Sequence, residues 1–349
     1  MTKSHDILIL SNMGPSLNSP ASGLFIENQY QALSSFNEFN IDFFYLSQDK
    51  RGFLLSKLKY PIFLLGFIKK FFLTRRYVDL IHVQFFYPNI LFAILYKFFK
   101  NKNVKILVTF HGSDIYHYMP PSKLYSWATN FIDESIFVSE NLQSKFYKKL
   151  KPSTVLSAGI LDCFSYNASS KKYDLIFIGH LDQNKGIDRL AKVLSSIRKH
   201  VSIAIVGQGD TSNLSSLFEL QQHNVQYFGT LSPEQLAKII NQSRFLINLS
   251  RNESFGLVMT EAMSCGVPVI ATKTDGSLLQ VFHKSNGFLL DNDDDFIELN
   301  GSKCISDWLS ISAIEYKSLC SQSLKSSAPY RLSDVAKRLR VIYNELLLK

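Results

Sequence analysis

Short apolar runs alternate with longer, helix-like stretches along the first half of the chain. Five of these runs are predicted to be buried strands: DILIL (6–10), IDFFYL (41–46), VDLIHVQF (78–85), VKILVTF (104–110) and SIFVS (135–139). Each is followed by a segment long enough for a helix. Nearly continuous apolar strands separated by helices are typical of parallel sheets that are buried on both faces. The pattern therefore predicts βα units on a parallel sheet.

The alternation of apolar runs and helix-like stretches stops at the polar, Ser-rich stretch SYNASSKK (165–172), which is predicted to be a linker. It then restarts, and five further strands are expected: DLIFIG (174–179), SIAIVG (202–207), VQYFG (225–229), RFLINLS (244–250) and PVIAT (268–272). Residues 330–349 carry apolar positions at helical spacing and predict a closing helix. We therefore expect an α/β chain of two doubly wound domains facing a central cleft, 1–165 and 172–329, with helix 330–349 packing back on the first.

Length and composition agree with this division. A chain of 349 residues favours two domains, and 46% hydrophobic with 19% charged residues is ordinary for a globular protein. The only apolar run near the start is Ile7–Leu10, too short for a signal peptide, and no run approaches the ~20 residues of a spanning helix. The four cysteines show no CxxC spacing and are expected to be reduced, buried thiols. The sequence predicts a cytoplasmic protein.

Positive charge is concentrated in the first half. Of the net charge of +9, residues 1–165 carry +7, from 18 Lys and Arg against 11 Asp and Glu. The excess is densest in 51–76, which has seven cations, no acids and many Phe and Leu. Two interpretations stay open: an anionic membrane surface, into which apolar side chains enter while cations remain outside, or a core-facing helix with a solvated basic face. Binding to nucleic acid fits the mixture with Phe and Leu less well.

Ligands of open parallel sheets bind beyond the carboxyl ends of the strands. The segment RNESFGLVMTEAMSCG (251–266) follows a predicted strand and reads as a loop and a short helix, with Ser254 as N-cap and Gly266 at C′. A helix N-terminus attracts oxygens and negative charge. Carboxylates accept paired hydrogen bonds from vicinal hydroxyls, so two glutamates eight residues apart suit an extended polyhydroxyl ligand.

The whole stretch ESFGLVMTEAMSCGVPVIAT (253–272) resembles the E-x7-E signature of retaining GT-B glycosyltransferases of family 4 (glycosyl transferases group 1). The resemblance covers nearly the whole chain and implies two Rossmann-like domains. Further motifs in the family's order support it: SGLFIENQYQAL (22–33), TFHGSD (109–114), FIGHLDQNKGID (177–188), AIVGQGD (204–210), NVQYFGTLS (224–232) and NGFLL (286–290).

Catalytic roles follow from this resemblance. It implies that Glu253 binds a hydroxyl of the donor sugar and that His111 lies near the reacting sugar. It also implies that Lys185 neutralises the donor diphosphate. Such a cation stabilises the transition state more than the ground state, because cleavage leaves extra negative charge on the phosphate.

Donor-binding roles are implied for six further positions. Glu261 is expected to bind the ribose, Gly23 to let the backbone approach the phosphates, and the amides of Phe255, Gly256 and Leu257 to assist Glu253. His180 stands where the family usually has arginine. Since histidine is charged only part of the time near neutral pH, the phosphate clamp is expected to be weaker, pH-sensitive or shared.

Other patterns favour plainer interpretations. DNDDD (291–295) has the spacing of a metal–diphosphate site, but crowded carboxylates usually face water, and no metal is expected. Glu253 and Glu261 could be the acid and base of a glycosidase, but that leaves Lys185 and the two domains unexplained. Asp114 is expected to cap a turn rather than to act as a base.

The sequence thus predicts a metal-independent retaining hexosyltransferase without a cofactor. It would use a nucleotide diphosphate sugar and a saccharide or lipid-linked saccharide acceptor, in cell-surface polysaccharide biosynthesis at the inner face of the cell membrane. Two alternatives stay open: a sugar-nucleotide epimerase on the same scaffold, and a non-catalytic basic protein that binds nucleic acid.

Overall fold

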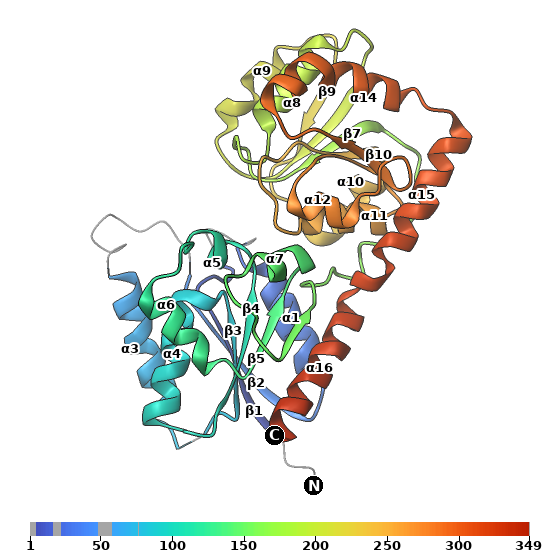
Figure 1. The fold of residues 1–349 in the computed structure, drawn as a ribbon. Helices are drawn as coiled ribbons and strands as arrows, with labels where there is room; N and C mark the ends of the chain where they lie inside the picture. Colours follow the sequence, from blue (N-terminus) through green and yellow to red (C-terminus); the bar gives the residue numbers. More distant parts are fainter. Residues whose placement is uncertain (1–4, 17–21, 48–57, 76, 349) are drawn as a thin grey trace. The chain divides into compact units, whose positions relative to one another are not determined.

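The chain divides into two compact units. A computed structural model describes residues 5–16, 22–47, 58–75 and 77–348 (Figure 1). Unit 1 comprises Met1–Gly159 together with Leu332–Lys349, and unit 2 comprises Ile160–Arg331. Each unit is built around its own six-stranded sheet.

The sheet of unit 1 is parallel throughout, in the order β2-β1-β3-β4-β5-β6. Its strands are β1 (His5–Ser11), β2 (Phe39–Tyr45), β3 (Leu80–Gln84), β4 (Lys105–Phe110), β5 (Glu134–Phe137) and β6 (Ser153–Val155). Strands β3, β4 and β5 are almost wholly buried, as expected of a parallel sheet that is covered on both faces.

Helices cover both faces of this sheet. They are α1 (Leu24–Ser34), α3 (Lys59–Phe71), α4 (Phe86–Phe99), α5 (Ser113–Tyr116), α6 (Lys123–Ala128), α7 (Glu140–Lys145) and α16 (Leu332–Leu348). Figure 1 shows α1 and α16 on one side of the sheet and α3, α4 and α6 on the other. α16, the closing helix expected over 330–349, packs Val335, Leu339 and Tyr343 into a core shared with β1 and α1.

The sheet of unit 2 is parallel, in the order β12-β11-β10-β7-β8-β9. Its strands are β7 (Tyr173–Ile178), β8 (Ser202–Val206), β9 (Asn224–Tyr227), β10 (Ser243–Asn248), β11 (Val269–Thr272) and β12 (Gly287–Leu290). Alternate side chains enter two separate cores: Leu175 and Phe177 point to one face of β7, and Ile176 points to the other.

The helices of unit 2 are α8 (Ile187–Ser196), α9 (Ser215–Phe218), α10 (Pro233–Asn241), α11 (Leu257–Ser264), α12 (Asp275–Gln280), α13 (Asp294–Phe296), α14 (Ser302–Leu309) and α15 (Ala313–Ser327). α8 is the most sharply amphipathic of these by sequence, and its Leu190, Val193 and Leu194 are buried against the sheet. Ser232 and Gln235 form a capping box that begins α10 after its loop.

The predicted fold class, two doubly wound parallel-sheet domains, is confirmed, and all ten predicted strands form. β6 and β12 were not predicted as strands, because each is short and lies at the edge of its sheet. Residues 165–172 have no regular structure, as expected of a linker. They are nevertheless anchored to unit 2, since the Asn167 N–H donates to Asn241 Oδ1 at 2.8 Å.

The structure bears on two further expectations, one about the cysteines and one about membrane-spanning helices. All four cysteines are free, but only Cys265 is buried, and Cys163, Cys304 and Cys320 are partly exposed. Among the described residues, no helix combines the length and the apolar character needed to cross a membrane.

Candidate active site

Two neighbouring strand ends of unit 2 bring the predicted catalytic pair together. β7 and β10 are adjacent and parallel, so the loops that follow them leave the same edge of the sheet. The first loop carries Lys185 and the second carries Glu253. Lys185 Nζ donates to Glu253 Oε2 at 2.5 Å, and these side chains are only 29% and 15% exposed.

Gly186 explains why the first loop can lie so close to β10. It adopts φ +77° at the start of α8, where a Cβ atom would stand 2.2 Å from the Leu249 carbonyl oxygen. Only glycine combines this conformation with this approach. A larger residue would push Lys185 away from the end of β10.

The second loop turns sharply before its helix begins. Ser254 is not the N-cap, contrary to the sequence-based expectation: α11 begins at Leu257, and Gly256 occupies the capping position at φ +81°. The reason is that Phe255 is buried, with its carbonyl accepting from Gln280 Nε2 and its ring against Tyr330. The predicted end of the helix is confirmed, since Gly266 follows Cys265 with φ +70°.

Gly256 also makes room for the carboxylate. A Cβ atom at this position would lie 2.8 Å from Glu253 Cγ. The N–H groups of Phe255, Gly256 and Leu257 have no hydrogen-bond acceptor among the described residues. The Glu253 carboxylate and free amides thus lie together at the N-terminus of an eight-residue helix, an arrangement suited to binding sugar hydroxyls and phosphate oxygens.

Glu261 lies further along α11. Burial raises the pKa of its carboxyl group to about 7. Burial raises the pKa of the Cys163 and Cys265 thiols, and the nearby Glu261 carboxylate raises it further. A carboxyl group poised near neutrality ionises readily when hydroxyl donors reach it.

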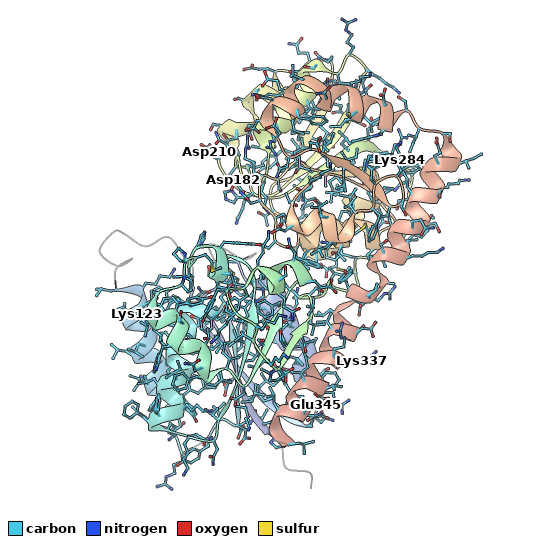
Figure 2. The ribbon with its side chains drawn as sticks, viewed as in Figure 1. Lys123, Asp182, Asp210, Lys284, Lys337 and Glu345 are labelled. Carbon is cyan, nitrogen blue, oxygen red and sulfur yellow. The ribbon has the colours of Figure 1, made fainter. Side chains whose placement is uncertain are left out.

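The loop after β7 also contains His180. Its Nδ1 lies 3.2 Å from Asp182 Oδ2, and Asp182 Oδ1 accepts from the Lys185 N–H at 2.8 Å. Figure 2 shows Asp182 near Asp210, which follows β8 on the same edge of the sheet. His180 is about half exposed, so the imidazole that replaces the family's arginine is accessible and already has a carboxylate beside it.

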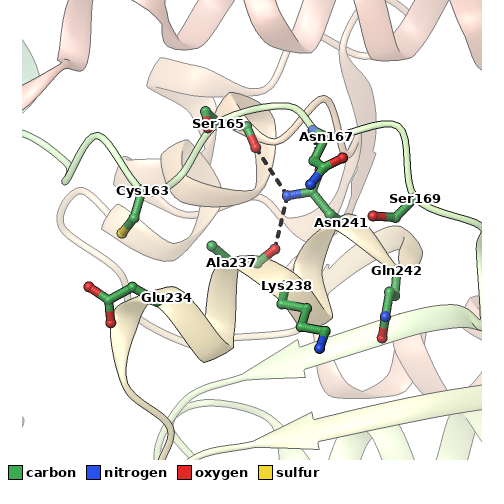
Figure 3. A pocket seen from close by; sticks show the side chains of 9 residues that line it. All are labelled: Cys163, Ser165, Asn167, Ser169, Glu234, Ala237, Lys238, Asn241 and Gln242. Atoms are coloured by element: carbon green, nitrogen blue, oxygen red, sulfur yellow. Dashed lines mark hydrogen bonds between the residues drawn. The ribbon is translucent and has the colours of Figure 1, made fainter.

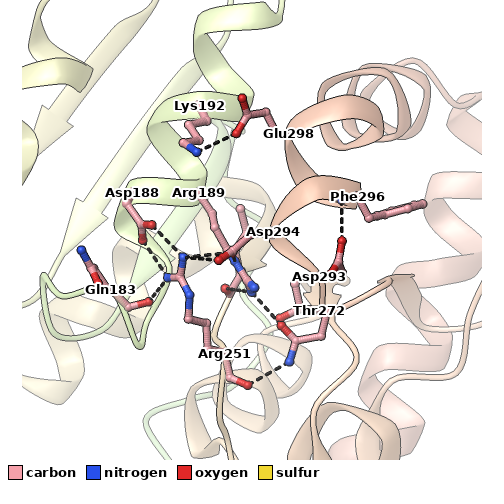
Figure 4. Close-up of polar contacts among 12 residues, drawn as sticks. Gln183, Asp188, Arg189, Lys192, Arg251, Thr272, Asp293, Asp294, Phe296 and Glu298 are labelled. Atoms are coloured by element: carbon pink, nitrogen blue, oxygen red, sulfur yellow. Dashed lines mark hydrogen bonds and ion pairs between the residues drawn. The ribbon is translucent and has the colours of Figure 1, made fainter.

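Arg251 ties the two catalytic loops together, and sequence reasoning missed it. Its backbone N–H donates to Asn184 O at 2.7 Å, and its guanidinium donates to Gln183 O. The same guanidinium binds Asp188 at the start of α8, at 2.8 and 3.0 Å (Figure 4). One arginine therefore holds the Lys185 loop against the loop that carries Glu253.

Asp294, in the acidic run 291–295, belongs to the same hydrogen-bond network as Arg251. Asp294 accepts from Arg251 and, at 2.6 Å, from Arg189 Nε, whose side chain is only 5% exposed. Asp293 caps α13, and Asp291 pairs with Lys273. These carboxylates thus bind cations and backbone amides of the fold. Among the described residues, no group of three or more His, Cys, Asp or Glu side chains could hold a metal ion.

Unit 1 holds the remaining predicted residues, Gly23 and His111. Gly23, at φ +66°, precedes α1, and a Cβ atom there would lie 3.0 Å from the backbone of Gly14. The His111 ring contacts the rings of Phe25 and Phe85, with centroids at 5.2 and 4.4 Å. Burial lowers the pKa of His111 to about 3. These residues therefore form a neutral, aromatic setting.

Asp114 orders the backbone around His111. Its Oδ1 accepts from the N–H groups of His111 and Gly112, and its Oδ2 accepts from the N–H of Phe86. The turn-capping role predicted for Asp114 is therefore confirmed. Its carboxylate joins the loop after β4 to the start of α4.

A polar hollow of about 330 Å³ lies elsewhere on unit 2, between residues 163–169 and α10 (Figure 3). The Asn241 side chain lines this hollow, and its amide group donates to the carbonyl oxygens of Ser165 and Ala237. None of the predicted site residues lines this hollow.

A comparison with a model of a known protein family matches most of unit 2. Residues 162–300 match the family described as Glycosyl transferases group 1. These residues therefore resemble a group 1 glycosyltransferase domain. The matched stretch includes Lys185, Glu253 and Glu261. The chain also resembles an uncharacterized glycosyltransferase of Methanocaldococcus jannaschii, at 28% identity over 219 residues. That match spans 61% of either chain.

A second relative of the glycosyltransferase domain is the N-acetyl-alpha-D-glucosaminyl L-malate synthase of Bacillus anthracis, 25% identical over 258 residues and 67% of either chain. Among solved structures, the sucrose-phosphate synthase of Thermosynechococcus elongatus matches 99% of both chains with a TM-score of 0.76 and 17% identity. HepE of Anabaena, in complex with UDP and glucose, covers 98% of this chain and matches over its own full length (TM-score 0.71, 18% identity). The architecture is therefore the GT-B fold.

Proposed function

We propose that this group 1 glycosyltransferase is a retaining hexosyltransferase, which moves a hexose-type sugar from a nucleotide diphosphate sugar to a saccharide acceptor. The observation that carries the proposal is the 2.5 Å contact between Lys185 Nζ and Glu253 Oε2 on adjacent strand ends. The pair places one cation and one hydroxyl-binding carboxylate within reach of a single small ligand. The UDP and glucose bound by HepE are ligands of that chemical class.

Lys185 is assigned to the leaving diphosphate. When the bond between the sugar C1 and the phosphate oxygen breaks, its electron pair stays on the phosphate, and the ammonium group stabilises the added charge. Donor binding then requires Lys185 to exchange part of its contact with Glu253 for phosphate oxygens. Arg251 keeps the two loops together during this exchange through its contacts with Asn184 and Asp188.

Most of the other donor contacts are assigned to the same edge of the unit 2 sheet, and Gly23 belongs to unit 1. Glu253 and the free amides of Phe255, Gly256 and Leu257 are assigned to sugar hydroxyls, and Glu261 is assigned to the ribose. Gly23 and His180 are assigned to the phosphates. Since His180 lies beside Asp182, we expect it to support Lys185 rather than to replace an arginine fully.

The acceptor is assigned to unit 1, near His111. In a retaining transfer the acceptor hydroxyl oxygen forms its bond to C1 on the face from which the diphosphate leaves. The hydroxyl proton passes to the departing phosphate oxygen, so the step needs no protein nucleophile. We further propose that it needs no metal and no cofactor, because Lys185 supplies the positive charge; the expected result is full turnover in EDTA.

The described part of 51–76 supports a membrane-side acceptor; residues 51–57 and Arg76 of that segment lie outside the described residues. α3 buries Phe63, Phe67 and Phe71, as a core-facing helix does. Its other face exposes Ile62, Leu65 and Lys69, and the helix carries no acid. Such a surface suits anionic lipids, and it fits a lipid-linked saccharide acceptor in cell-surface polysaccharide biosynthesis at the inner face of the membrane.

The membrane proposal is tested by sedimentation with vesicles. We expect binding to vesicles that contain phosphatidylglycerol, weaker binding to purely zwitterionic vesicles, and loss of binding in Leu65→Asp. Leu299→Asp, at a similarly exposed apolar position of unit 2, is the matched control. Equal binding by both variants would refute the role of α3.

The activity is tested in two steps. A thermal-shift screen with UDP, GDP, ADP and their sugars identifies the donor, and release of nucleoside diphosphate with a saccharide panel then measures transfer. Product formed from the donor alone would favour the epimerase. Steeply salt-dependent binding to duplex DNA without any nucleotide shift would favour the non-catalytic alternative. A folded protein that releases no nucleoside diphosphate with any donor and acceptor would overturn the proposal.

A further inference from the structure

A chain of buried polar side chains runs through β3 to His111. His82 and Gln84 lie two residues apart on this strand, so they point to the same face of the sheet, and they are 1% and 0% exposed. Buried polar groups in an apolar core are stable only when their hydrogen bonds are satisfied. The partners of these two side chains therefore decide how their protons are arranged.

The contacts form one connected path. His111 Nε2 lies 2.8 Å from Gln84 Oε1, and Gln84 Nε2 lies 3.2 Å from His82 Nε2. His82 Nε2 also lies 2.7 Å from Thr109 Oγ1, while His82 Nδ1 lies 2.7 Å from Tyr343 Oη. Tyr343 belongs to α16, so the C-terminal helix is one end of the path and His111 is the other.

The amide of Gln84 assigns the protons. An amide oxygen can only accept and an amide nitrogen can only donate. His111 therefore carries its proton on Nε2, which donates to Gln84. His82 Nε2 accepts from Gln84, so its proton is on Nδ1 and is donated to Tyr343 Oη. If the amide were turned over, both imidazoles would need the opposite tautomer.

Neither imidazole is placed to become charged. Burial lowers the pKa of His82 and of His111 to about 3, and each lies near the other. The rings of Phe25 and Phe85 both contact the His111 ring. His111 Nδ1 has no hydrogen-bond partner among the described residues, so its lone pair is left as an acceptor.

We propose that Gln84 is a positioning residue that holds His111 as the neutral Nε2–H tautomer, so that Nδ1 accepts a hydrogen bond from a substrate hydroxyl. The role in substrate binding rests on the proposed function, whereas the tautomer does not. The substrate group that meets His111 must then be a donor. A sugar deoxygenated or O-methylated at that position would lose the contact.

The tautomer is tested by NMR of the full chain labelled with ¹⁵N-histidine. We expect the Nε2–H pattern for His111 and the Nδ1–H pattern for His82, with neither ring becoming charged down to about pH 5. His223 is an internal reference, because its Nδ1 accepts from the Val201 N–H and its Nε2 faces Leu194 O at 2.8 Å. The opposite tautomers, or a charged His111 near pH 6, would overturn the proposal whether or not the protein is active.

The positioning role is tested by Gln84→Met, which keeps the length of the side chain and removes both hydrogen bonds. We expect His111 to show a mixture of tautomers and kcat/KM for the donor to fall about tenfold, the effect of one lost hydrogen bond. Gln29→Met is the matched control, because Gln29 is a buried amide of the same unit that donates to Ala158 O at 2.8 Å. It should lower stability yet leave the His111 signal unchanged.

A second substitution separates packing from proton placement. Gln84→Glu places a carboxylate, which can only accept hydrogen bonds, opposite both imidazole rings. His82 must then carry its proton on Nε2, while His111 keeps its proton on Nε2. We expect the His82 pattern to switch and that of His111 to remain. Gln84→Met with an unchanged His111 tautomer and full activity would refute the positioning role, even if the transferase activity itself is established.

Discussion

The two units position their candidate site residues by opposite electrostatic means. In unit 2, Lys185 and Glu253 form an ion pair, and the loops that carry them are held by Arg251, Asp188 and Asp294. In unit 1, the His111 ring is held by a hydrogen bond to the neutral amide of Gln84 and by aromatic contacts, while Asp114 binds its backbone N–H. One site is a network of charges close to solvent, and the other is a buried polar chain without net charge.

This difference in electrostatics between the two units matches the chemistry that is assigned to each unit. A departing diphosphate develops negative charge, which fixed cations stabilise directly. A sugar hydroxyl is neutral before and after binding, so a neutral acceptor orients it without attracting competing anions. The comparison predicts that substitutions and pH changes affect unit 2 strongly and unit 1 weakly.

The largest effect is expected from the ion pair. Lys185→Ala and Glu253→Ala should each lower kcat by about 100-fold or more, because each removes a contact that strengthens in the transition state. Steady-state assays with circular dichroism to verify folding make the measurement. Lys192→Ala removes a lysine of the neighbouring α8 that binds Glu298 and should be neutral. Normal rates in both site variants would remove the site assignment.

The network that holds the loops should have the next largest effect. Arg251→Ala is expected to lower turnover about tenfold and the free energy of unfolding by about 2 kcal/mol, since it leaves Asp188 and part of Asp294 unpaired. Arg244→Ala is the control, because Arg244 pairs with Asp174 in the same unit. It should cost stability without affecting turnover. If Arg251→Ala behaved in the same way, Arg251 would have no positioning role.

The pH dependence of donor affinity should be smaller and should come from Glu261. Its carboxyl group has a pKa of about 7 in the free protein, so it is largely ionised above that pH and neutral below it. Ribose hydroxyls bind the ionised form better, so affinity should fall as pH falls below about 7, by at most tenfold per pH unit. Calorimetry from about pH 5.5 to 8 measures this. Glu261→Gln should bind more weakly with a flat profile, and a retained slope would assign the titration to another group.

The smallest effect is expected at the far end of the polar chain in unit 1. Tyr343→Phe removes the acceptor of the His82 Nδ1 proton and should lower the free energy of unfolding by about 1 kcal/mol. Turnover should stay within about twofold, because Gln84 still holds His111. Urea unfolding and steady-state assays give the two values. A loss of activity as large as that of Gln84→Met would show that α16 controls His111.

The two sites also differ in how far the sequence predicted them. Lys185 follows β7, and Glu253 and Glu261 follow β10, and the motifs in these two stretches of sequence predicted all three residues. Arg251 is in the same stretch, two residues before Glu253, but its role depends on Gln183, Asp188 and Asp294, which no local spacing connects. Ser254 was assigned the wrong role, because the burial of Phe255 delays the helix by two residues.

Unit 1 offered a weaker signal. Polar residues at alternate positions of an otherwise apolar strand, His82 and Gln84 in VDLIHVQF, indicate a buried polar pair. That pattern could have found the pair, but not its partners. Tyr343 is separated from His82 by 261 positions and meets it only because α16 packs back on β3.

The sequence by itself determined the alternation of strands and helices, the two sheets and the loops proposed to bind ligands, because these depend on side chains that are near one another along the chain. Only the tertiary structure decided which loops lie against each other and which partners set the proton positions proposed for the polar chain. It also decided which carboxyl group, that of Glu261, has a pKa near 7. Those properties depend on burial and on partners brought together by strand order. No local pattern of residues encodes them.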